Sequence, residues 1–217
     1  MGFSGMPDEG LAFLEDLEER NTKEFFDAHK QVFLQQVQAP FAALLDAACG
    51  RLRRSVPGLG RPKVFRIYRD LRFSKDRTPY NTSMRAWVAH PSEGVETGYY
   101  VDVGPGGMYA GGGRYHWERP ELERLRAAVA DPEAGDELAR ILRRATRKGM
   151  EPWLDPLQRM PRPYPADHPR AELLRARSLT VGRRRQRGPW LLTGELLDHL
   201  VEDWRSLVPL NRWLERV

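Results

Sequence analysis

The spacing of hydrophobic residues changes along the chain and separates a helical beginning from a middle with another periodicity. Leucines recur at helical spacing at positions 11, 14 and 17. The sequence NTKE at 21–24 predicts a capping box, with Asn21 as the N-cap and Glu24 three residues later. A second helix is expected after it, and Pro40 is expected to open a third because proline suits the first turn of a helix.

From residue 63 the hydrophobic period becomes two, which predicts β-strands. The segments are KVFRIYRDLRF (63–73), TSMRAWVAH (82–90), GYYVDV (98–103) and, weakened by glycines, MYAGGG (108–113). GPGG at 104–107 predicts a hairpin turn. The connections are too short for helical crossovers, so the sheet is expected to be mainly antiparallel.

Helical patterns return after the glycines, at 119–131 and 136–148, and a proline-rich connection follows at 151–169. Residues 170–181 predict a helix that leads into a short strand, and 193–217 predict one or two amphipathic helices. The sequence therefore predicts a single α+β domain over residues 1–217. Its mostly antiparallel sheet, at about residues 63–113, is expected to be packed by N- and C-terminal helices.

Composition narrows the class of protein. The 217 residues are 41% hydrophobic and 30% charged, as in globular proteins. No apolar run approaches the roughly 20 residues that span a bilayer, and no secretory signal is visible. The single cysteine, Cys49, excludes an internal disulfide and a cysteine-rich metal site. A cytoplasmic protein without a membrane partner is expected.

The positive charge is concentrated in one short stretch. The formal net charge is +5, and residues 61–80 hold seven Lys or Arg against two Asp, which is also +5 (7 − 2). This concentration makes the stretch the first candidate for contact with an anion.

The same stretch carries a family resemblance. RIYRDLRFSKDRTPY (66–80) resembles the RxxRDxRFxx(D/N)KxxY signature of a widespread family of bacterial proteins, also present within longer fungal proteins, whose function is unknown. Arg77 stands where the signature usually has lysine. FLEDLEERNTKEFFDAHK, GGGRYHWERPELERLR, DHPRAELLRARSL and PLNRWLE extend the similarity over nearly the whole chain. The resemblance implies a fold and a motif, and it implies no activity, cofactor or catalytic residue.

In a regular strand, alternate residues of this motif would share a face. Phe65, Ile67, Leu71 and Phe73 would form an apolar face, with Arg66, Tyr68, Asp70 and Arg72 opposite. Arg69 would fall on the apolar face, where a guanidinium group is costly unless it is paired. Either Arg69 has an internal carboxylate or carbonyl partner, or a bulge turns it toward the polar face.

Two roles for the motif stay open. Its arginines and aspartates form ion pairs that brace the sheet, or its guanidinium groups bind phosphate or carboxylate. The binding hypothesis predicts a small anionic, possibly phosphorylated, ligand. Its candidate residues are Arg66, Arg69, Asp70, Arg72, Lys75, Asp76, Arg77 and Tyr80. If the protein is an enzyme, Asp70, Asp76 and Asp102 are the acid–base candidates nearby.

Other motifs in the sequence do not identify a ligand or a reaction. The glycines at 104–113 match neither a dinucleotide fingerprint nor a Walker loop, and the five histidines show no metal-ligand spacing, so no cofactor or metal is expected. The basic clusters RRATRK (143–148) and GRRRQR (182–187) are expected to be solvated helix ends or loops. Association with nucleic acid through them is the second hypothesis, and a structural or partner-binding role is the third.

Overall fold

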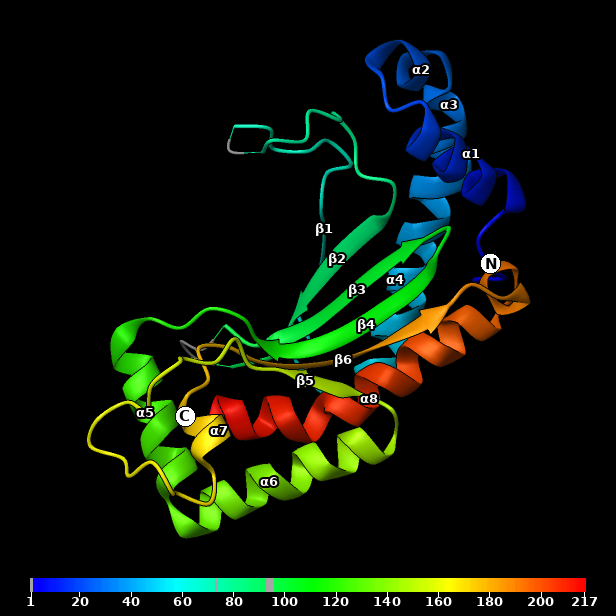
Figure 1. The fold of residues 1–217 in the computed structure, drawn as a ribbon. Helices are drawn as coiled ribbons and strands as arrows, with labels where there is room; N and C mark the ends of the chain where they lie inside the picture. The colour runs from blue at the N-terminus through cyan, green and yellow to red at the C-terminus, as the bar shows by residue number, and fades with distance from the viewer. Residues whose placement is uncertain (1, 73, 93–95) are drawn as a thin grey trace.

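One antiparallel sheet organises the chain (Figure 1). The computed structural model describes residues 2–72, 74–92 and 96–217. The strand order is β1-β2-β3-β4-β6-β5, and every neighbouring pair is antiparallel. The strands are β1 (Pro62–Val64), β2 (Met84–Ala89), β3 (Gly98–Gly104), β4 (Gly107–Arg114), β5 (Glu151–Trp153) and β6 (Leu179–Gln186).

Helices precede, interrupt and follow the strands. Before the sheet lie α1 (Asp8–Glu19), α2 (Lys23–Ala28), α3 (Lys30–Val32), the π-helical η1 (Phe33–Gln38) and α4 (Ala39–Leu52). After β4 come α5 (Arg119–Ala130), α6 (Pro132–Arg147), α7 (Ala171–Leu174), the 3-10 turn η2 (Pro189–Leu192) and α8 (Glu195–Glu215). Among the residues that the structure describes, no helix is long and apolar enough to cross a membrane.

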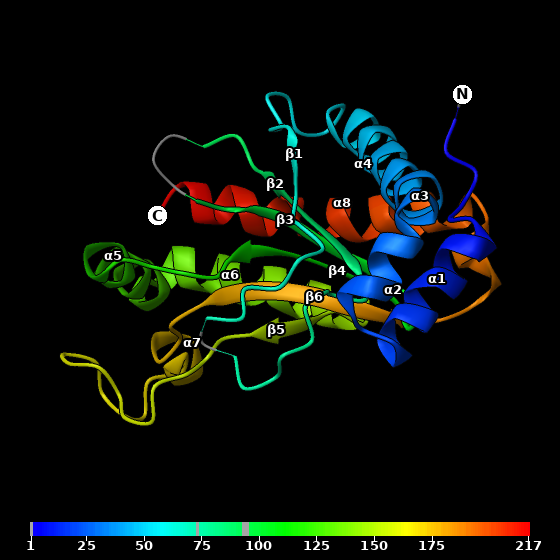
Figure 2. The same ribbon diagram turned by 90° about the horizontal axis from the view of Figure 1, so that it is seen from above.

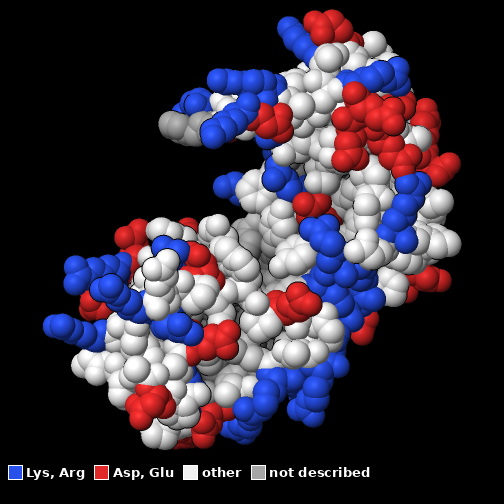
Figure 3. Space-filling model, in the orientation of Figure 1, with Lys and Arg blue, Asp and Glu red and all other residues white. Residues whose placement is uncertain are grey.

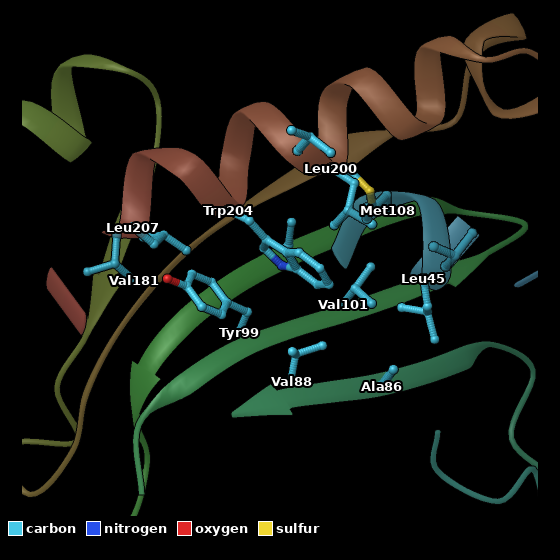
Figure 4. Close-up of a cluster of buried hydrophobic side chains, with 14 of the residues drawn as sticks. Leu45, Ala86, Val88, Tyr99, Val101, Met108, Val181, Leu200, Trp204 and Leu207 are labelled. Atoms are coloured by element: carbon cyan, nitrogen blue, oxygen red, sulfur yellow. The ribbon is translucent and has the colours of Figure 1, made fainter. Parts of the chain in front are cut away.

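The core lies between one face of the sheet and helices α4 and α8 (Figure 4). Trp204 of α8 is fully buried over the strands, and its indole Nε1 donates a hydrogen bond of 3.1 Å to the Tyr100 carbonyl. Side chains from alternate strand positions surround it, as expected for a sheet with one covered face. They include Ala86, Val88, Tyr99, Val101, Met108 and Val181.

The opposite face of the central strands is not covered by any helix in the described part of the chain (Figures 1 and 2). Trp87, Tyr100 and Tyr109 lie on it and are half-buried. The connection between β1 and β2, residues 65–83, projects over this open face. The predicted fold class, an α+β sheet packed by N- and C-terminal helices, is confirmed.

The strand predicted over 63–73 is wrong. β1 ends at Val64, and the chain then runs irregularly, with one isolated bridge between Tyr68 and Tyr80. Short polar side chains satisfy the backbone locally and compete with strand pairing. The Asp70 carboxylate accepts from the Arg72 backbone N–H at 3.2 Å, and Asp76 accepts from Thr78 in the same way at 2.9 Å. Phe73 lies outside the described residues.

The sheet extends beyond the predicted range of 63–113. Residues 182–187, predicted as a loop or helix end, mostly belong to β6, and β5 lies at the start of the predicted proline-rich connection. The hairpin turn predicted at GPGG is confirmed by the pairing of Gly104 with Gly107.

One prediction about a helix end is also wrong. The N-cap of α2 is Thr22, whose hydroxyl accepts from the Phe25 backbone N–H, because the Asn21 side chain bonds the backbone of Tyr80. The position predicted for Pro40 is confirmed, since Pro40 lies in the first turn of α4. This helix continues directly from the π-helical η1.

Candidate functional site

The open face of the sheet has an aromatic surface with glycines between the rings. Trp87 of β2 pairs in register with Tyr100 of β3, which pairs with Gly111 of β4. Gly111 is followed across the sheet by Gly182 of β6. A Cβ atom on Gly182 would lie 2.2 Å from the Tyr109 hydroxyl oxygen, so this glycine makes room for the tyrosine ring.

A cavity of about 470 Å³ opens above this surface, and we call it the aromatic hollow. Tyr115 and Trp153 form one wall, with ring centroids 5.1 Å apart and planes within 5° of parallel. Both side chains are exposed, by 67% and 44% respectively. The lining residues are Trp87, Tyr100, Tyr109, Gly111, Gly112, Tyr115, Trp153 and Thr180.

A charged row crosses the same face beside the hollow. Arg85, Asp102, Tyr109 and Arg184 are successive partners on β2, β3, β4 and β6. The Arg184 guanidinium carbon lies 5.7 Å from the centroid of the Tyr109 ring, a cation–π contact. Burial raises the pKa of Asp102, although a hydrogen bond from Ser83 and the two nearby arginines oppose the shift. The row therefore holds two cations and one carboxyl group.

Above the face stands the arginine segment, which we define as residues 65–80. Figure 3 shows Lys and Arg side chains on this projecting part of the molecule, with a deep concavity beneath it. The segment connects to the sheet at Phe65, whose ring centroid lies 6.4 Å from that of Tyr100. Its cations and the aromatic hollow thus belong to one side of the protein.

The far end of the segment is anchored to the N-terminal helices. Tyr80 is buried, and its ring stacks on Phe26 at a centroid distance of 4.2 Å. The Asn21 side chain accepts from the Tyr80 backbone N–H and donates to its carbonyl, each at 3.0 Å. Asn81 donates to the Ile67 carbonyl through its backbone N–H at 2.7 Å. These contacts fix both ends of the projecting loop.

Two arginines are neutralised inside the segment. Arg69 donates to the Asp76 carboxylate and the Thr78 hydroxyl, and its side chain is 25% exposed. It has the carboxylate partner that one sequence interpretation required. Arg72 donates to both oxygens of Asp70, through Nε at 3.0 and 3.1 Å and through Nη2 at 2.6 Å.

These contacts also change the acidity of the two carboxyl groups. Hydrogen bonds from the Thr78 backbone and from Arg69 lower the pKa of Asp76 to about 2. Hydrogen bonds from Arg72 lower the pKa of Asp70. Both carboxylates are therefore ionised near neutral pH and are engaged within the segment.

The eight predicted site residues do not converge on one point. Arg66, Lys75 and Arg77 are exposed, and none forms a salt bridge with a carboxylate of the described residues. Arg77 donates to the Leu71 carbonyl at 3.3 Å. Tyr80 belongs to the core, and the remaining four residues form the two internal pairs. Three of the predicted eight are therefore exposed cations that form no salt bridge with a described carboxylate, and Arg72 is exposed but paired with Asp70.

The basic cluster at 182–187 is divided between the two faces of the sheet. Arg183 and Arg185 point toward α8 and pair with Asp203, which is fully buried. Arg184 is exposed on the open face. The cluster does not present one continuous basic surface.

Sequence reasoning missed the aromatic hollow. One signal for it was present, since Val88 and Val101 belong to the buried alternation and therefore place Trp87 and Tyr100 on the opposite face. Trp153 gave no such signal, because its strand has three residues and includes a proline.

Comparison with known proteins is consistent with the resemblance of the arginine motif. A family model described as a conserved hypothetical protein matches residues 9–213. No curated protein and no solved structure matches the chain. Since the family model covers nearly the whole sequence, the chain belongs to the DUF2461 family of conserved hypothetical proteins.

Proposed function

We propose that this protein binds a small anionic ligand between the arginine segment and the open face of the sheet. One observation carries the proposal: Arg66, Lys75 and Arg77 are exposed on a segment that is anchored at both ends. This segment projects over a face of the sheet that has its own arginines. A segment whose ends are already anchored loses less backbone freedom on binding than a mobile loop, which favours affinity for phosphate or carboxylate.

The internal pairs give the motif a second role that is compatible with binding. Arg69 joins positions 74, 76 and 78 through its hydrogen bonds, so it shapes the loop. The bracing hypothesis therefore applies to Arg69, and the binding hypothesis applies to the exposed cations. Of the three acid–base candidates named from the sequence, Asp102 lies on the open face, and Asp70 and Asp76 are engaged by arginines.

Nucleic-acid association has weaker support. Arg183 and Arg185 donate to the buried Asp203 carboxylate, so they do not contribute to a phosphate-binding surface. Nucleic-acid association would therefore depend on the cations at 143–148 and on Arg184.

Thermal unfolding with inorganic phosphate and pyrophosphate, at constant ionic strength, tests the proposal. A ligand that binds only the folded protein raises the unfolding temperature. We expect stabilisation of the wild type that is reduced in Arg66→Ala and in Lys75→Ala. Arg54→Ala is the matched control, because Arg54 is an exposed cation just after α4, a helix that packs on the opposite face of the sheet. Absence of stabilisation in the wild type, or an equal loss in the control, would refute anion binding at this site.

A further inference from the structure

The aromatic hollow offers ring faces and very few hydrogen-bonding groups. Five of its eight lining residues are Trp or Tyr, and two others are glycines. Burial raises the pKa of Tyr100 to about 12 and also raises the pKa of Tyr109, so both phenols are uncharged near neutral pH. A flat aromatic ring can stack on such a lining.

The size of the hollow also suits a small ring-bearing molecule. Its volume of about 470 Å³ lies within the range of about 300–1,000 Å³ typical of small-ligand pockets. Gly111 adds depth to the floor of the hollow, because a Cβ atom at this position would project on the open face beside the Tyr109 ring. The exposed pair of Tyr115 and Trp153 gives the hollow a flat wall at its open side.

Positive charge lies on two sides of the hollow. Arg85 and Arg184 belong to the adjoining row of the sheet. The arginine segment begins at Phe65, next to the Tyr100 ring that lines the hollow. An anionic group on a ligand seated on the rings therefore has the two arginines of the adjoining row near it, together with the Asp102 carboxyl group of the same row.

From this arrangement we infer that the ligand is an anion with a planar aromatic ring, of the chemical class of the nucleoside phosphates. The ring lies in the aromatic hollow, and the phosphate is held by the cations beside it. This inference rests on the proposed function and adds the class of ligand. It assigns to Trp87, Tyr100, Tyr109, Tyr115 and Trp153 a role in binding that no residue of the arginine motif supplies.

Calorimetric titration with three probes separates the inference from the proposed function. Adenosine 5′-monophosphate and ribose 5-phosphate carry the same phosphate and differ by the base, and adenosine lacks the phosphate. Stacking of one base on aromatic side chains favours binding by about 1–3 kcal/mol. We therefore expect the wild type to bind adenosine 5′-monophosphate at least about fivefold more tightly than ribose 5-phosphate.

Two variants locate the effect. Trp153→Ala and Tyr115→Ala remove exposed rings, so both proteins are expected to fold and to lose most of the preference for the base. Leu34→Ala is the control, since Leu34 is an exposed hydrophobic side chain of η1, outside the hollow. Its preference should equal that of the wild type.

Each contrary result has its own meaning. Equal affinity for the two phosphates overturns the ring inference and leaves anion binding intact. Equal affinity for adenosine and its monophosphate supports the ring site and refutes the anionic function. No binding of any probe overturns the inference, as does self-association that Trp153→Ala abolishes, because a second copy of the chain would then cover the hollow.

Discussion

Asp203 provides the sharpest test of the way in which the sheet is held on α8. Its side chain is fully buried and is the shared carboxylate partner of Arg183 and Arg185. Those two side chains are only 20% and 19% exposed. Asp203→Ala would leave two largely buried guanidinium groups without this carboxylate.

The expected loss of stability depends on the hydrogen-bond partners that the two arginines keep after the substitution. Breaking a buried ion pair by removing one partner costs about 3–5 kcal/mol. Glu202 still lies 2.9 Å from Arg185, and the Lys148 carbonyl still accepts from Arg183 at 2.9 Å. We therefore expect the lower end, about 3 kcal/mol, which is a large part of a typical stability of about 5–15 kcal/mol.

Urea unfolding followed by tryptophan fluorescence measures this loss, because Trp204 lies next to Asp203 in the sequence and is buried in the core. Glu202→Gln is the matched control. Glu202 contacts the same arginines but is 60% exposed, so its loss should cost less than about 1 kcal/mol. A cost below about 1 kcal/mol for Asp203→Ala, or equal costs for the two variants, would refute the reasoning.

Two further predictions concern the open face and the arginine segment. Gly182→Ala should push the Tyr109 ring into the aromatic hollow. We expect it to lower the free energy of unfolding in urea by about 1 kcal/mol and to weaken the binding of adenosine 5′-monophosphate. Unchanged affinity would contradict the packing of Tyr109 against Gly182. The Asp76 carboxyl group should titrate by NMR near pH 2, and its midpoint should rise part of the way toward 3.8 in Arg69→Ala. Because this folded-state pKa lies below the unfolded value, the carboxylate stabilises the fold above about pH 4, and the stabilisation is lost as the pH falls through about 2. A wild-type midpoint at 3.8 would contradict this.

The sequence predicted the parts of the sheet whose alternation is hydrophobic. In β2 and β3 every second side chain is buried, including Val88 and Val101. Such alternation is visible in the sequence without a structure. Only the start of β6 was predicted, because two of its later inward positions are Arg183 and Arg185. Their partner lies 18–20 residues later in α8, and no local signal identifies it.

The alternation at 65–73 was misleading for the opposite reason. Its apolar residues have strand spacing, but Asp70 and Asp76 satisfy nearby backbone groups and favour turns. The concentration of positive charge made this segment the candidate site, and its role in binding stays a prediction. It did not reveal the aromatic hollow, because Tyr115 and Trp153 come together only when β4 and β5 take their places beside β6.

The central claim is that an anion binds between the arginine segment and the open face of the sheet. The most direct measurement is an NMR titration of backbone amide signals with adenosine 5′-monophosphate and, separately, with inorganic phosphate. Saturable shifts of the amide signals are predicted within residues 65–80 and at Tyr100 and Arg184. For residues that line the aromatic hollow, the shifts should be larger with adenosine 5′-monophosphate than with inorganic phosphate. Shifts confined to α6 or α8, or no saturable shift with either probe, would contradict the claim.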